Sequence, residues 1–261
     1  MQRGCPDPRG LLDAGISDGD ANEILVRMKI HGVFKTTWSD RFPQTTRQLA
    51  RSGLSPQAVI ADVGASDGST SLSVMRAVRF GRYYVTDRYV EAYACTTRKG
   101  MFFCDEHANP FMFANRFVVI YNEPDEVSRS QSGIVKNLFA GFDMTKCKDV
   151  RKVPLMNRAL LPKLGDDVRL ERYDIFEAWP HEKADLVIAA NILNRDYFSD
   201  SLIADALRNL RGALKEGGRL ALIENRPAEQ SNLFRLEHGR FIVENQVGAG
   251  SDIQSLVGGL A

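Results

Sequence analysis

Apolar residues in this chain form short runs and helical stripes that alternate along the sequence. Short apolar runs of this kind predict strands, and they cover residues 59–63, 82–86, 168–173, 184–190 and 219–223. The run 184–190 is almost continuously apolar, which is typical of a parallel strand covered on both faces. Strands separated by helical stretches favour an α/β fold with a mostly parallel sheet.

Helical spacing is clearest in residues 200–214. Their apolar side chains fall on one stripe, Asp200 stands at the start, and Gly217 follows the end. Residues 20–31 and 45–51 show the same spacing and predict two N-terminal helices.

The chain is expected to divide into an N-terminal helical cap, residues 1–56, and a main domain, residues 57–261. The main domain is expected to end in an antiparallel hairpin at 232–247. Residues 95–165 interrupt the alternation and predict an inserted β-hairpin/helix subdomain. Its basic segment 146–163 favours either contact with an anionic substrate or an ordinary solvated surface.

Composition and charge are those of an ordinary globular protein. Apolar residues make up 44% and charged residues 26%, and a formal net charge of +1 gives no reason to expect binding to nucleic acid or to a membrane surface. The four cysteines lack metal-binding or disulfide spacing, so no metal site is expected. Without a membrane-spanning run or a signal-like start, a soluble, cytoplasmic protein is expected.

The stretch after the first strand carries the most specific pattern. The strand 59–63 runs into a turn between Gly64 and Gly68, and a helix is predicted from Ser69. Glycine permits positive φ and a close approach of the backbone to a ligand, and a helix N-terminus offers free N–H groups. The spacing is not the Gly-x-Gly-x-x-Gly of dinucleotide sites, and Asp62 precedes the first glycine by two positions.

Asp62-x-Gly64-x-Ser66-x-Gly68 resembles the Asp-x-Gly-x-(Gly/Ser)-x-Gly motif of class I, Rossmann-like methyltransferases that use S-adenosylmethionine. The ammonium and sulfonium groups of that cofactor favour nearby carboxylates. Ser66 stands where the family has its middle glycine, so the turn is expected to differ slightly. The resemblance implies a Rossmann-like, seven-stranded, mostly parallel sheet with a terminal antiparallel hairpin, and S-adenosylmethionine as the cofactor.

The resemblance also implies roles for residues at later strand ends. Asp87 would accept hydrogen bonds from the ribose hydroxyls, Asp174 would accept one from the adenine amine, and Ile175 would pack on the adenine ring. The complete set of implied cofactor-binding residues is Asp62, Gly64, Ala65, Ser66, Gly68, Asp87, Arg88, Asp174, Ile175, Asn191 and Ile192.

The residues after the fourth strand, 191–198, resemble the Asn-x-Leu-x-x-x-Phe motif of chemotaxis-receptor glutamate methyltransferases. The likeness covers this loop alone and does not extend to the receptor substrate. Tyr197 and Asp196 are the predicted catalytic residues, because they follow this strand and are expected to line the acceptor pocket. Further candidates for a general base are His107, His181, Glu224 and His238.

The expected function is methyl transfer to a small molecule, on oxygen or nitrogen, with a polar or anionic acceptor. Methylation of RNA or of a protein carboxylate is a first alternative, although the near-neutral charge disfavours nucleic acid. A non-catalytic binding or scaffold protein that keeps the fold is a second. The sequence does not indicate the acceptor atom or the oligomeric state.

Overall fold

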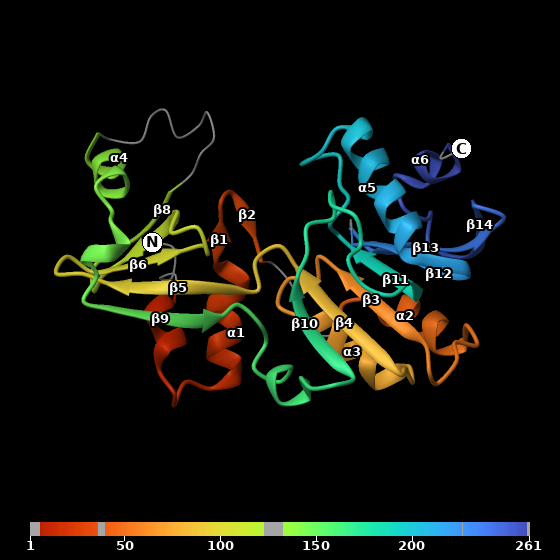
Figure 1. The fold of residues 1–261 in the computed structure, drawn as a ribbon, viewed down its shortest axis with the longest axis horizontal. Helices are drawn as coiled ribbons and strands as arrows, with labels where there is room; N and C mark the ends of the chain where they lie inside the picture. The colour runs from red at the N-terminus through yellow and green to blue at the C-terminus, as the bar shows by residue number, and fades with distance from the viewer. Residues whose placement is uncertain (1–5, 36–39, 123–132, 226, 260–261) are drawn as a thin grey trace. The chain divides into compact units, whose positions relative to one another are not determined.

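The computed structural model describes residues 6–35, 40–122, 133–225 and 227–259. The chain divides into two compact units. Unit 1 comprises residues 1–37 and 89–161, and unit 2 comprises residues 38–88 and 162–261. Figure 1 shows the course of the chain through both units.

Unit 2 is built on a mixed seven-stranded sheet with the order β10-β4-β3-β11-β12-β13-β14. Its strands are β3 (Val59–Val63), β4 (Arg82–Asp87), β10 (Val168–Arg172), β11 (Ala184–Ala190), β12 (Leu214–Asn225), β13 (Glu229–Glu237) and β14 (Arg240–Val247). The first five strands pair in parallel and the last two pair antiparallel. The predicted α/β class and seven-stranded sheet are therefore confirmed, and parallel pairing stops at β12.

The strand order has a switch point in the middle of this sheet. β3 lies between β4, which follows it in the chain, and β11, which comes much later. The chain thus leaves β3 and β11 in opposite directions, which is the switch point at which open α/β sheets bind ligands beyond their strand ends. Val63, the last residue of β3, pairs with Thr86 of β4 and with Ala189 of β11.

Helices cover both faces of the sheet in unit 2 (Figure 1). They are α2 (Pro43–Arg51), α3 (Ser69–Ala77), α5 (Asp200–Ala213) and α6 (Gln254–Gly258). Alternate residues of β3 show the two faces: Asp62 contacts Ser71 of α3, whereas Val63 belongs to the apolar core that contains α5. Along α5, Ile203, Leu207 and Leu210 are fully buried at helical spacing.

The terminal hairpin of unit 2 has the turn that its sequence predicts. His238 and Gly239 connect β13 to β14, and both have positive φ, at 51° and 74°. Two consecutive left-handed residues make the turn whose twist matches that of a two-stranded ribbon.

Unit 1 contains a five-stranded antiparallel sheet with the order β8-β7-β6-β5-β9. Its strands are β5 (Glu91–Thr96), β6 (Met101–Cys104), β7 (Pro110–Ala114), β8 (Val119–Tyr121) and β9 (Asp149–Pro154). The other elements are η1 (Pro8–Leu12), α1 (Asp18–Arg27), β1 (Lys29–Ile30), β2 (Val33–Phe34), α4 (Gly133–Ala140), η3 (Met144–Lys146) and, at the boundary, η4 (Leu161–Lys163). The insertion therefore contains the predicted hairpin, β6 and β7, and a helix, α4, and the hairpin is part of a five-stranded sheet.

The N-terminal helices belong to different units. Ile24 and Leu25 of α1 are buried in one apolar core with Phe103 and Phe111 of the inserted sheet. α2, in contrast, packs on α3 in unit 2. The boundary predicted at residue 56 is not one of the boundaries of these units. In the described part of the chain, no helix combines the length and the apolar character that a membrane crossing requires.

Candidate functional site

The turn between β3 and α3 alternates left-handed residues with ordinary ones. Gly64, Ser66 and Gly68 have φ of 67°, 60° and 80°. The turn is anchored to β4, because the Ala65 amide donates to the carbonyl oxygen of Thr86 at 2.9 Å. Ser66 holds the conformation that glycine adopts without steric cost, at roughly 1–2 kcal/mol for a residue with a Cβ atom.

Asp62 lies at the end of β3 with its carboxyl group completely buried. Its Oδ2 atom accepts hydrogen bonds from the Ser71 hydroxyl at 2.6 Å and from the Tyr83 hydroxyl at 3.2 Å. Its Oδ1 atom has no hydrogen-bond partner among the described residues. Burial raises the pKa of Asp62 to about 6, against the two hydroxyl donors that act to lower it. An unsatisfied buried oxygen of this kind is costly, and an added donor would stabilise it.

Carboxylates from the ends of β4 and β10 meet beside the turn. Asp87 accepts a hydrogen bond from the Ser66 amide at 2.8 Å through Oδ2. Arg88 places its Nε atom 3.5 Å from Oδ2 of Asp174, and Oδ1 of Asp174 accepts from the Phe176 amide at 3.1 Å. The structure thus brings together the predicted cofactor residues Asp87, Arg88 and Asp174, and it engages each with protein partners.

Ile175 and Ile192 have different surroundings from those that a cofactor role implies. Ile175 is buried in the core that contains α5. Ile192 lies against the turn: a Cβ atom at Gly64 would stand 2.1 Å from Cδ1 of Ile192. The space directly above Gly64 is therefore filled by a side chain of the loop that follows β11.

That loop also holds two buried asparagine amides. Asn191 has φ of 54°, and its Oδ1 atom accepts from the Asn225 amide at 3.0 Å. Oδ1 of Asn194 accepts from the Asp196 amide at 2.7 Å. The Nδ2 atoms of Asn191 and Asn194 have no acceptor among the described residues.

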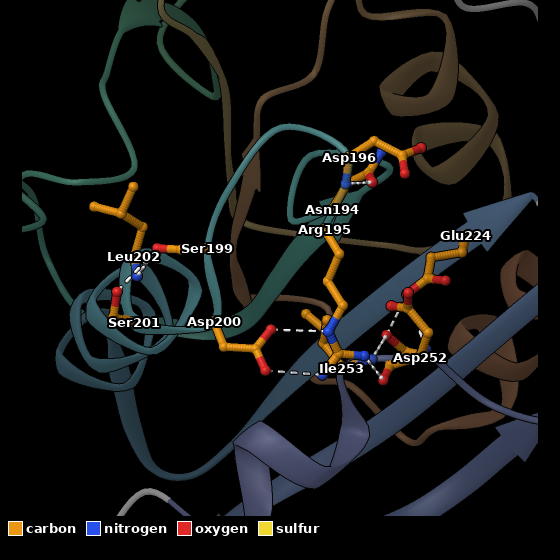
Figure 2. Close-up of polar contacts among 11 residues, drawn as sticks. Asn194, Arg195, Asp196, Ser199, Asp200, Ser201, Leu202, Glu224, Asp252 and Ile253 are labelled. Atoms are coloured by element: carbon orange, nitrogen blue, oxygen red, sulfur yellow. Dashed lines mark hydrogen bonds and ion pairs between the residues drawn. The ribbon is translucent and has the colours of Figure 1, made fainter.

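These asparagines line a pocket at the ends of β11 and β12. The pocket is lined by Asn191, Leu193, Asn194, Glu224 and Asp252. Glu224, the penultimate residue of β12, lies beside Asp252 of the C-terminal segment (Figure 2). Its Oε1 atom accepts hydrogen bonds from the Ser251 hydroxyl and from the Asp252 amide. Burial raises the pKa of Glu224, and the neighbouring charge of Asp252 acts in the same direction.

The predicted catalytic residues lie on this loop but outside the pocket lining. Tyr197 has 58% of its surface exposed, and Asp196 is exposed as well. Neither lines the pocket, and their catalytic roles stay a prediction. Glu224, a candidate base in the sequence, does line it. Asn194 and Asp252 were missed: Asn194 lies inside the recognised loop, whereas Asp252 follows β14 in the C-terminal segment and belongs to no motif.

No protein-family model matches the sequence, and no curated protein matches it. Solved structures show distant similarity. Human N-acetylserotonin methyltransferase in complex with S-adenosylmethionine has a TM-score of 0.37 and 14% identity, over 80% of this chain and 39% of that protein. The N-methyltransferase NodS from Bradyrhizobium japonicum has a TM-score of 0.35 and 14% identity, over 71% of this chain and 62% of that protein. YcgJ from Bacillus subtilis has a TM-score of 0.36 and 12% identity, over 70% of this chain and 50% of that protein.

The chain thus spans between 39% and 62% of the length of these three proteins. Similarity this weak supports no function for the chain. The assignment therefore depends on the residues of the site themselves.

Proposed function

We propose that this chain is an S-adenosylmethionine-dependent methyltransferase whose cofactor binds at the carboxyl ends of β3, β4, β10 and β11. These ends flank the switch point of the sheet, where open α/β sheets hold their ligands. One observation carries the proposal. Asp62 is completely buried beside a turn of three left-handed residues, and one of its carboxyl oxygens has no donor among the described residues.

The donor and acceptor groups fit the cofactor in kind. The sugar hydroxyls and the ammonium of the cofactor are hydrogen-bond donors, and carboxylates such as Asp87 and Asp62 accept from such groups. Asp174 would accept from the adenine amine. Bound S-adenosylmethionine supplies a methyl group that is already activated for transfer. The protein then has to position the acceptor and exclude water.

One contact has to change for the cofactor to bind over the turn. Ile192 fills the space above Gly64, so the proposal requires this side chain to adopt another rotamer. We propose that the acceptor is a polar small molecule methylated on oxygen or nitrogen, and that Tyr197 and Asp196 lie on its side of the site. Their position on the loop after β11 supports this assignment.

The contact between Ile192 and Gly64 also favours a second candidate, a non-catalytic binding protein that keeps the fold. In that case the turn is a packing element and its glycine exists to accommodate Ile192. The two candidates make opposite predictions about cofactor binding.

Titration calorimetry with S-adenosylmethionine separates them. We expect saturable heat with the wild-type chain, and an affinity lower by about tenfold for Asp87→Asn, because a charge-assisted hydrogen bond is worth about 1.5–3 kcal/mol. Ile192→Ala is expected to bind at least as tightly as wild type, because it opens the space above Gly64. Asp205→Asn, an exposed change on α5, is the matched control and should leave the affinity unchanged.

An absence of heat for both the wild type and Ile192→Ala, with folding verified by circular dichroism, would favour the non-catalytic candidate. Equal affinity of Asp87→Asn and the control would count against the assigned cofactor position.

A further inference from the structure

The pocket at the ends of β11 and β12 contains two side-chain amides whose orientation is determined by their neighbours. A backbone N–H group donates to Oδ1 of each asparagine, from Asn225 to Asn191 and from Asp196 to Asn194. An amide oxygen accepts and an amide nitrogen donates, so a reversed orientation would bring two donors together. The NH₂ group is therefore the remaining arm of each side chain, and neither has an acceptor among the described residues.

Asn194 makes this unsatisfied state costly. Only 5% of its surface is exposed, so solvent does not readily replace the missing acceptor. Buried polar groups without partners are uncommon in folded proteins, and each calls for an explanation such as a bound ligand. The pocket that Asn191 and Asn194 line supplies the place for one.

Glu224 and Asp252, the two carboxyl side chains of the pocket lining, supply hydrogen-bond acceptors where the asparagine amides supply donors. Arg195 follows Asn194 in the same loop and carries a positive charge. Its guanidinium forms two hydrogen bonds with Asp200, at 2.8 and 3.3 Å. Its third bond, at 2.7 Å, goes to the backbone carbonyl of Asp252. The pKa of Arg195 is raised by the Asp200 hydrogen bond first, and the charges of Asp252 and Glu224 act in the same direction. Figure 2 shows Arg195 extended between these two partners. The pocket lining itself carries acidic groups and no basic one.

We propose that this pocket binds a cationic amine that carries a neutral oxygen acceptor beside the nitrogen, as in an amino alcohol. The ammonium group would donate to Glu224 and Asp252, and the oxygen would accept from the amides of Asn191 and Asn194. Leu193, which is buried in the same lining, would contact the carbon atoms between them. Each polar group of the lining then has a partner of matching character.

The charge of the site distinguishes this ligand from related ones. A carboxylate next to the amine, as in an amino acid, would be repelled by the two acidic side chains, whereas a hydroxyl or a carbonyl would not. The preferred ligand is therefore cationic, in contrast to the polar or anionic acceptor expected from the basic segment of unit 1. That the amine is the methyl acceptor rests on the proposed function, but its binding does not.

Ethanolamine is the simplest probe of this chemistry, and nuclear magnetic resonance of the ¹⁵N-labelled full chain is the measurement. The side-chain NH₂ signals of Asn191 and Asn194, assigned by substitution, should shift saturably as ethanolamine is added without any cofactor. 1-Propanol lacks the ammonium, n-propylamine lacks the oxygen, and alanine adds a carboxylate. Each should bind at least about tenfold more weakly, since each loses or opposes one charged or polar contact.

Two variants locate the site. Glu224→Gln keeps the shape and removes a charge, and Asn194→Leu removes an unsatisfied donor. Both should weaken ethanolamine binding, and a thermal unfolding scan verifies that each is folded. Glu237→Gln is the matched control and should bind as wild type does. Glu237 is the last residue of β13, next to the hairpin turn, and is not among the residues that line the pocket.

Three results would overturn the proposal: no saturable shift, equal affinity for 1-propanol, or displacement of ethanolamine by S-adenosylhomocysteine. The last would assign the pocket to the amino-acid end of the cofactor. Ethanolamine binding without any heat from S-adenosylmethionine would instead contradict the proposed function and leave the pocket assignment standing.

Discussion

Two regions of unit 2 lie at the carboxyl ends of its strands, and they differ in how they satisfy their polar groups. The turn after β3 is closed. Its amides bond to Thr86 and Asp87, and Ile192 covers Gly64. The pocket at the ends of β11 and β12 is lined by unsatisfied amides and by carboxylates.

The difference separates two kinds of information. A glycine motif predicts backbone conformation, and the left-handed residues appear where the motif requires them. Whether the resulting space is open depends on a side chain more than a hundred residues later, which no local pattern determines. Unsatisfied buried polar groups indicate a candidate ligand site more directly than the motif does.

Gly64→Ala is the strongest test of the closed turn. The new Cβ atom would lie 2.1 Å from Cδ1 of Ile192 at a φ of 67°, so strain and overpacking together should lower the free energy of unfolding by about 4 kcal/mol. Urea denaturation measures the loss. Gly53 has φ of 69° and nothing within 4 Å of an added Cβ atom, so Gly53→Ala should cost only about 1 kcal/mol.

Combining Gly64→Ala with Ile192→Ala should recover the overpacking part of the loss. A double variant no more stable than Gly64→Ala would show that Ile192 does not cover the turn in solution.

Asp62 gives the next largest effect, as a dependence of stability on pH. Its pKa is raised to about 6 in the folded state from 3.8, so its protonated form favours folding. This stabilisation is fully present below about pH 4 and is lost as the pH rises through about 6. Above that pH, the free energy of unfolding is lower than at pH 4 by about 3 kcal/mol.

The measurement is the difference in unfolding free energy between wild type and Asp62→Asn between pH 4 and pH 8. The wild type should lose stability relative to the variant as the pH rises, because the variant cannot ionise. A constant difference would mean that Asp62 is solvated or paired in solution.

Ser66→Gly probes the same turn in the stabilising direction. Glycine adopts φ of 60° without the steric cost that serine incurs, so the variant should gain about 1 kcal/mol in unfolding free energy. Ser55 is exposed and is not among the positive-φ residues of the described chain. Ser55→Gly should therefore lose stability, through the entropy of the unfolded chain and through the hydrogen bond that its hydroxyl accepts from the Gln57 amide. A gain in both variants would refute the argument from φ.

Glu224→Gln should have the smallest effect on stability. The pKa of Glu224 is raised by burial and by Asp252, so removing its charge should raise the free energy of unfolding slightly at pH 7, because solvent screens a half-buried group. The gain should vanish as the pH is lowered and the wild-type carboxyl group becomes protonated. Urea denaturation of wild type and variant at pH 7 and at acidic pH checks the sign of this difference in unfolding free energy.

The parts of the fold that follow local patterns were predictable. The strands β3 and β11, the helix α5 and the turn at His238 and Gly239 appear where apolar periodicity and turn residues place them. The inserted five-stranded sheet was not, because β5 pairs with β9 across more than fifty residues and neither strand specifies its partner locally.

The same division holds for the site. Asp62, Asp87 and Asp174 could be found from the sequence because each stands at or just beyond the end of a predicted strand, and parallel strands bring their ends to one edge. Asp252 could not, since its place beside Glu224 depends on the packing of the C-terminal segment. Tyr197 was expected in the pocket from its sequence position, and the structure leaves it largely exposed.

By itself, the sequence determined the α/β class, the left-handed turn after β3 and the acidic residues at three strand ends, because these depend on residue type and on spacing within a few positions. Only the tertiary structure decided that Ile192 covers Gly64, that Asp62 keeps one oxygen unsatisfied, and that two asparagines with unpartnered amide groups line a pocket with Glu224 and Asp252. The physical reason is that packing and burial join side chains far apart in the chain, and these contacts determine which polar groups remain available to a ligand.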